Sequence, residues 1–97
     1  MEKKWQLYIL RCKDGTLYTG ITDNFPRRLE AHEAGKGAKY TRGRGPFVLC
    51  YLEECANHSH ALQREYAVKK LTRAEKIALC ETFRQEDFAY AVFFRHD

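Results

Sequence analysis

Two short segments near the start of the chain have the pattern of β-strands. Residues 7–10 form an unbroken apolar run, which predicts a strand that is covered on both faces. Residues 17–22 are rich in strand-forming residues and contain one glycine, where a backbone or a ligand could come close. Asp14 and Gly15 lie between the two segments and favour a tight turn, so this part of the chain is predicted to be a β-hairpin.

The length of the turn decides which side chains share a face of this hairpin. A two-residue loop would place Tyr8 and Tyr18 on opposite faces, whereas a three-residue loop places them diagonally on one face. The longer loop needs a residue with positive φ at its third position, which is where Gly15 stands. We therefore predict a three-residue loop, with Cys12 opposite Thr16 and two phenol groups side by side.

The rest of the pattern predicts three helices and a third strand. Asn24 is an N-cap candidate and Gly35 a C-terminal stop, and residues 72–75 form a capping box. The expected elements are a helix over 25–34, a strand over 47–53, a helix from 57–59 to about 71, and a helix from 72 to about 83. The fold class predicted is an α/β (α+β) sandwich, in which a three-stranded antiparallel sheet is flanked by three helices.

The last fourteen residues, 84–97, are aromatic and have no single periodicity. Phe88, Tyr90, Val92 and Phe94 alternate as in a strand, but further apolar residues stand between them. We expect this tail to belong to the same domain as residues 1–83, where it covers a face of the core or forms a partner interface.

Composition restricts the class of protein. Ninety-seven residues with 44% hydrophobic and 31% charged side chains predict one globular domain. No apolar run approaches the roughly 20 residues of a membrane span, and no secretory segment is present, so we expect a cytoplasmic protein without membrane contact. Four cysteines without a CxxC spacing are expected to be free thiols. A zinc site formed by Cys50, Cys55, His58 and His60 is disfavoured by its spacing.

Positive charge is concentrated in one segment. The net charge is +4, from 17 Lys and Arg against 13 Asp and Glu. Residues 35–46 carry several basic side chains and no acid, with Tyr40 in their middle, and Arg27 and Arg28 lie just upstream. This mixture suits contacts with phosphates and stacking on a base, although a solvated basic loop is the alternative.

Three of the candidate catalytic residues are evenly spaced. Tyr8, Tyr18 and Arg28 are ten residues apart on the two strands and the first helix, and His32 lies one helical turn after Arg28. Each of these residues alone has an ordinary structural explanation, because strands favour tyrosine and surfaces favour arginine. Their combination predicts a shared cleft.

Glu65 is the carboxylate candidate on the second helix. Its neighbours one turn away are mostly apolar, so its charge is expected either to be paired or to have a chemical task. An ion pair with Lys69, four residues later, is the structural alternative.

Taken together, these residues resemble the GIY-YIG nuclease domain of homing endonucleases, some restriction enzymes and excinuclease C. Gln6-Leu7-Tyr8 stands in place of the first triplet, and Tyr18-Thr19-Gly20 in place of the second. Arg28, His32 and Glu65 match the helix arginine, the histidine after it and the metal-binding glutamate. The resemblance covers about residues 4–76 and is closest to the small standalone bacterial members.

The resemblance implies phosphodiester hydrolysis with one Mg²⁺ or Mn²⁺ ion held by Glu65. Arg28 would contact the phosphate, and Tyr18 would activate the attacking water, which Tyr8 would orient. His32 would assist as proton acceptor.

The function predicted is a metal-dependent endonuclease, structure-selective or nonspecific, whose partner is nucleic acid, with DNA preferred and RNA as the alternative. The residues expected to contact nucleic acid are Arg27, Lys36, Lys39, Tyr40, Arg42, Arg44, Lys69 and Lys70. The chain lacks an asparagine that many family members have after the glutamate helix, and Ile21 stands where repair-type members often have lysine. These departures leave two alternatives open: a catalytically weak or inactive nucleic-acid-binding module, and a protein-interaction domain that docks through residues 88–94.

Overall fold

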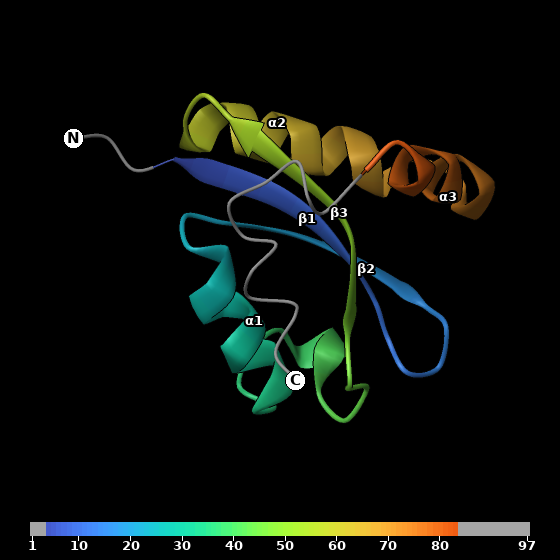
Figure 1. Cartoon of the computed structure of the whole chain (residues 1–97). Helices are drawn as coiled ribbons and strands as arrows, with labels where there is room; N and C mark the ends of the chain where they lie inside the picture. The colour runs from blue at the N-terminus through green and yellow to red at the C-terminus, as the bar shows by residue number, and fades with distance from the viewer. Residues whose placement is uncertain (1–3, 84–97) are drawn as a thin grey trace.

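The computed structural model describes residues 4–83, and the predicted aromatic tail lies outside them. An antiparallel sheet with strand order β2-β1-β3 forms the middle layer (Figure 1). Helix α1 covers one face of this sheet, and helices α2 and α3 cover the other. The predicted α+β architecture of three antiparallel strands and three helices is therefore confirmed. The elements are β1 (Trp5–Arg11), β2 (Leu17–Thr22), α1 (Phe25–Glu33), β3 (Val48–Cys55), α2 (His58–Lys69) and α3 (Arg73–Glu81).

The β1–β2 hairpin has the predicted three-residue loop. The Cys12 backbone N–H donates to the Thr16 carbonyl at 2.8 Å, and the Gly15 N–H donates to the Cys12 carbonyl at 2.9 Å. Gly15 has φ +86°, the left-handed conformation that glycine adopts without steric cost. The resulting register sets Tyr8 and Tyr18 on one face with ring centroids 6.3 Å apart, which confirms the predicted side-by-side phenols.

Strand β3 is longer than predicted and carries a β-bulge. The prediction ended at residue 53, but pairing with β1 continues to Cys55. The register shifts between Ile9 and Leu10, because Ile9 pairs with Tyr51 whereas Leu10 pairs with Leu49. Cys50 is the extra residue of this bulge. The bulge turns Leu49 to the same side of the sheet as Leu52, where both pack in the cluster that contains Tyr8.

Local side-chain caps explain where the helices begin. The Asn24 side chain accepts a hydrogen bond from the Arg27 N–H at 3.2 Å, and Asn57 caps α2 through the His60 N–H at 2.8 Å. The predicted capping box of α3 is present, with Thr72 and Glu75 bonded to each other's backbone N–H groups. Helices α2 and α3 both end two residues earlier than predicted, at residues 69 and 81.

The two faces of the sheet bury different side chains. Leu7 and Ile9 of β1 pack against Ala61 and Val68 of α2. The intervening Tyr8 and Leu10 face α1, where Phe25 is fully buried, because successive side chains of a strand point to opposite faces. None of the helices within residues 4–83 has the length and apolar composition of a membrane span.

Candidate active site

A buried chain of hydrogen bonds lies between the sheet and the segment after α1. The Tyr8 Oη is 2.8 Å from His32 Nε2, and His32 Nδ1 is 2.8 Å from Thr41 Oγ1. Tyr8 lies on β1, His32 on the last turn of α1 and Thr41 on a 3₁₀ turn, Lys39–Thr41. All three side chains are at most 1% exposed. The structure therefore joins two predicted site residues, Tyr8 and His32, to a third residue that the sequence did not indicate.

The environment of Tyr8 and His32, the two titratable groups in this series of hydrogen bonds, keeps both side chains neutral near pH 7. Burial raises the pKa of Tyr8 to about 12, with a smaller increase from the Tyr18 and Glu65 charges and an opposing decrease from Arg28. Burial lowers the pKa of His32 to about 4, and the positive charge of Arg28 adds to this decrease. The Tyr8–His32 pair is therefore a phenol and a neutral imidazole in the resting protein.

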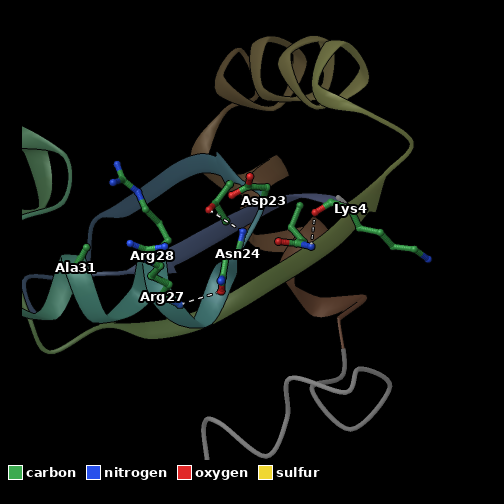
Figure 2. Close-up of a pocket in the computed structure, with 8 residues that line it drawn as sticks. Lys4, Asp23, Asn24, Arg27, Arg28 and Ala31 are labelled. Atoms are coloured by element: carbon green, nitrogen blue, oxygen red, sulfur yellow. Dashed lines mark hydrogen bonds between the residues drawn. The ribbon is translucent and has the colours of Figure 1, made fainter. Parts of the chain in front are cut away.

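Arg28 connects this pair to a solvent-accessible cavity. Its guanidinium lies close enough to the Tyr8 phenol to lower the phenol pKa by hydrogen bonding. The same side chain lines a cavity of about 440 Å³ at the start of α1 (Figure 2). In Figure 2, Arg27 and Arg28 stand on the helix side of this cavity and Lys4 at its other end. The full lining is Lys4, Gln6, Thr22, Asp23, Asn24, Arg27, Arg28 and Ala31. Arg27 and Arg28 supply positive charge for a phosphate on the helix side of the cavity, and Asp23 adds a carboxylate to the lining.

Gly20 and Gly37 have no side chain where the rings of Tyr8 and His32 pack against them. A methyl group at Gly20 of β2 would lie 2.5 Å from Tyr8 Oη and 2.7 Å from Tyr8 Cζ. A methyl group at Gly37 would overlap the His32 ring at Nδ1. Any other residue at these two positions would displace the hydrogen-bonded rings. The glycine predicted in β2 thus permits the close approach of a side chain from β1.

Glu65 of α2 forms the ion pair that was the structural alternative in the sequence-based interpretation. Its carboxylate pairs with Lys69 at 3.2 Å, and its side chain is 22% exposed. Its charge also makes a small contribution to the raised pKa of the Tyr8 phenol, after the larger effect of burial. The described residues contain no group of three or more His, Cys, Asp or Glu side chains arranged to hold a metal ion. A hard divalent cation could still bind one carboxylate if water and phosphate oxygens complete its coordination, and Glu65 fits that arrangement.

Tyr18 is covered by the segment that follows α1. Tyr40 stacks on the Tyr18 ring with a centroid distance of 5.9 Å and an interplanar angle of 20°. The Arg44 guanidinium lies over the Tyr40 ring, 4.4 Å from its centroid, and forms an ion pair with Asp14 of the hairpin turn. Arg44 and Tyr40 thus already have protein partners, whereas Lys36, Lys39 and Arg42 are exposed.

The two predicted lysines of α2 and its C-terminus also have partners. Lys69 pairs with Glu65, and Lys70 lies over the Tyr66 ring, 4.0 Å from its centroid. Tyr66 is 64% exposed, so this aromatic side chain with a cation above it is accessible at the surface. The sequence reasoning did not select Tyr66, although its position beside Glu65 could have drawn attention to it.

Thr41 and Gly37 are the other site residues that the sequence reasoning missed. Both lie in the basic segment 35–46, where charge was the visible feature. No spacing relates Thr41 to His32, because the chain turns at Gly35, which has φ +75°, before it returns to the histidine. Only the tertiary structure brings the two side chains together.

The arrangement as a whole defines a small α+β domain with a candidate phosphodiester-cleaving site on one face of its sheet. Two tyrosines, an arginine and a histidine meet there, while Glu65 belongs to α2, which covers the other face, and its charge contributes to the raised pKa of Tyr8. The chain belongs to the GIY-YIG family, because the family model described as the GIY-YIG catalytic domain matches residues 4–78. Membership of this family suggests nuclease activity and nucleic-acid binding.

Small proteins of the UPF0213 group are among the relatives of this chain. A UPF0213 protein of Oceanobacillus iheyensis is 54% identical over 86 residues, which are 89% of this chain and 100% of that protein. The solution NMR structure of a protein from E. faecalis is similar with a TM-score of 0.59 and 41% identity, covering 86% of this chain and 91% of that one. The UPF0213 protein from Bacillus halodurans, also solved by NMR, has a TM-score of 0.54 and 47% identity, covering 81% and 84% of the two chains.

Proposed function

We propose that this protein is a metal-dependent endonuclease that hydrolyses phosphodiester bonds in DNA, with structure-selective or nonspecific action. The observation that carries the proposal is the buried Tyr8–His32 hydrogen bond beside Arg28. A phenol with a proton acceptor on one side and a guanidinium on the other suits the deprotonation of a water molecule next to a phosphate. The family supports the same class of reaction.

In this mechanism Arg28 binds the scissile phosphate and stabilises the charge that develops on its oxygens. Tyr8 Oη takes a proton from the attacking water while its own proton passes to His32 Nε2, 2.8 Å away. Burial lowers the pKa of His32 in the resting protein, and the positive charge of Arg28 adds a smaller decrease. Once a phosphate neutralises the arginine, that effect weakens and His32 becomes a better proton acceptor.

Tyr18 has a different place in this scheme from the one that the sequence suggested. The sequence assigned water activation to Tyr18 and orientation to Tyr8. The hydrogen bond to His32 favours the reverse, since Tyr8 has a proton acceptor behind its hydroxyl. The Tyr18 ring contacts His32 edge to face, with centroids 5.4 Å apart, and supports the histidine. We therefore propose Tyr8 as the activating residue and Tyr18 as the orienting one.

Glu65 would hold the single Mg²⁺ or Mn²⁺ ion, which supplies charge neutralisation at the phosphate when bound. In the structure Glu65 is paired with Lys69. Binding of a cation therefore requires this ion pair to open, and the freed lysine is then available to the nucleic-acid backbone.

The nucleic-acid surface that we propose joins the cavity beside Arg28 to the exposed basic residues of the segment 35–46. Contacts of this kind bind phosphates and carry no sequence information. Binding should therefore weaken steeply with salt, while base sequence should matter little.

The test is cleavage of labelled single-stranded, duplex and branched DNA with Mg²⁺ or Mn²⁺. Wild type is compared with Glu65→Ala and with Glu30→Ala, which removes an exposed carboxylate of α1 as a matched control. We expect product from wild type and Glu30→Ala, and a loss of at least about 10²-fold in Glu65→Ala. Equal turnover by Glu65→Ala would exclude the role given to this carboxylate.

The second candidate function is nucleic-acid binding without cleavage. The Glu65–Lys69 ion pair favours it, because a paired carboxylate is less available to a cation. This candidate predicts salt-dependent binding that is equally strong in chelator, and no product from wild type with either metal. Metal-dependent product formation excludes it.

A further inference from the structure

We propose that Thr41 is a positioning residue that fixes His32 in the Nδ1–H tautomer and thereby aims the Tyr8 hydroxyl. The inference rests on the proposed function for its catalytic consequence, but the tautomer itself is a property of the folded protein.

The hydrogen bond between Thr41 and Ala38 determines the direction of the other hydrogen bonds in the series. Thr41 Oγ1 donates its only hydrogen to the Ala38 carbonyl oxygen at 2.8 Å. The same oxygen lies 2.8 Å from His32 Nδ1, and it can engage that nitrogen only as an acceptor. His32 Nδ1 therefore carries the hydrogen.

A neutral imidazole has one N–H, so His32 Nε2 is then an acceptor. The partner of Nε2 is Tyr8 Oη at 2.8 Å, which must donate. The two lone pairs of the Tyr8 oxygen are then its acceptor sites, and the guanidinium of Arg28 donates to this oxygen. The phenol is thus prepared to accept a proton from the cleft as it passes its own proton to His32.

The opposite tautomer would reverse this arrangement. With the hydrogen on His32 Nε2, the ring would donate to Tyr8 Oη and occupy one of its lone pairs. The phenol hydrogen would turn towards the cleft, and no acceptor would stand behind it. Proton transfer from the cleft through Tyr8 to His32 would then be blocked, because Nε2 already carries a proton.

The fold leaves little room for another hydrogen-bond partner at His32 Nδ1. Thr41 is 1% exposed, and its backbone N–H also bonds the Ala38 carbonyl at 3.1 Å, so the 3₁₀ turn sets the hydroxyl in place. Gly37 packs directly against Nδ1. A buried hydroxyl with a fixed donor direction specifies the tautomer in the way that a buried carbonyl or carboxylate does behind other histidines.

Thr41 also lies in the segment that carries the exposed basic residues Lys39 and Arg42. The two kinds of side chain predict different kinetic effects. Loss of a phosphate-binding lysine should raise KM and lower the salt dependence of binding. Loss of the Thr41 hydroxyl should lower kcat, because the proton path changes while the binding surface stays.

The experiment is ¹⁵N NMR of the histidine rings in wild type, Thr41→Val and Thr41→Ser, with His32 assigned by comparison with His32→Gln. We expect the Nδ1–H tautomer in wild type and in Thr41→Ser, and a shift towards Nε2–H in Thr41→Val. In cleavage assays, Thr41→Val should lose about 10²-fold in kcat with KM nearly unchanged, and Thr41→Ser should recover most of it. Lys39→Gln is the matched control, with a changed KM and an unchanged tautomer.

An Nε2–H tautomer in wild type would overturn the proposal without any variant, so a poorly folded Thr41→Val does not prevent the test. A retained Nδ1–H tautomer and kcat in folded Thr41→Val would overturn it as well. The NMR measurement and the cleavage assay also distinguish this proposal from the proposed function. If wild type cleaves nothing but the tautomer changes in Thr41→Val, the positioning role stands and the nuclease assignment fails.

Discussion

The two faces of the sheet differ in what they bury, although the same strand supplies both. On the α2 and α3 face, Leu7 and Ile9 meet apolar side chains. On the α1 face, Tyr8 from the same strand reaches a buried histidine, which in turn contacts a buried threonine. Both faces bury apolar side chains, but only on the α1 face does the neighbouring residue of β1, Tyr8, add a buried polar site.

This contrast indicates that the two faces contribute differently to stability and to activity. Apolar burial stabilises a protein without demanding exact partners, whereas a buried polar group is costly unless its hydrogen bonds are made. On the α1 face, the buried polar groups of Tyr8, His32 and Thr41 are hydrogen-bonded in series, and the last bond is accepted by a backbone carbonyl. We expect substitutions in the hydrogen-bonded series Tyr8–His32–Thr41 to change activity more than stability, and substitutions of the apolar β1 residues that pack against α2 to do the reverse.

Tyr8→Phe should have the largest effect. The variant removes the hydroxyl that lies between His32 and Arg28, so turnover should fall by about 10³-fold, or about 4 kcal/mol in the activation barrier. The free energy of unfolding should fall by only about 1–3 kcal/mol, the cost of an unsatisfied Nε2. Single-turnover cleavage and urea unfolding measure the two effects. Turnover within tenfold of wild type would contradict the contrast between the faces.

Leu7→Ala tests the opposite face. Leu7 is fully buried against α2, so the variant should lose about 3 kcal/mol in the free energy of unfolding through lost burial and the cavity left behind. Its specific activity, measured at a temperature where the variant remains folded, should stay near that of wild type. A large fall in activity with unchanged stability would show that the two faces are not separable in this way.

The pH dependence of stability isolates His32. Its pKa is about 4 in the folded protein, below its ordinary value of 6.5, so the unfolded chain binds the proton first. Stability should therefore fall between about pH 6.5 and pH 4, by up to about 3 kcal/mol, with no further loss from this group at lower pH. The measurement is the difference in urea unfolding between wild type and His32→Gln across this range. A difference that is constant with pH would show that His32 is not buried in its neutral form.

Arg64→Met should have the smallest effect. Arg64 of α2 bonds both carboxylate oxygens of Glu53 on β3, at 2.7 and 2.9 Å, and this ion pair is partly exposed. We expect a loss of about 1 kcal/mol at pH 7 in thermal or urea unfolding and no change in cleavage. Hydrogen bonds from Arg64 and Tyr51 lower the pKa of Glu53 against the opposing effect of its burial. The difference from wild type should therefore shrink at acidic pH, as the carboxylate is protonated.

Local features of the sequence were sufficient to predict most of the fold. Gly15 selects the three-residue loop and the shared face of the two tyrosines, because only a positive φ closes that turn. The caps at Asn24 and Thr72 locate helix starts, since they act through hydrogen bonds within one turn. Helix ends and the bounds of β3 were predicted less well, because packing against other elements decides them.

The spacing of Tyr8, Tyr18, Arg28 and His32 was visible in the sequence because hairpin register and helix period are local rules. Tertiary structure alone decided which of these groups bond to one another. The Thr41 hydroxyl reaches His32 through a turn that no periodicity describes, and the Cys50 bulge moves Leu49 to the site's face of the sheet. The physical reason is that periodicity specifies the face on which a side chain lies, whereas a hydrogen-bond partner depends on how distant segments pack.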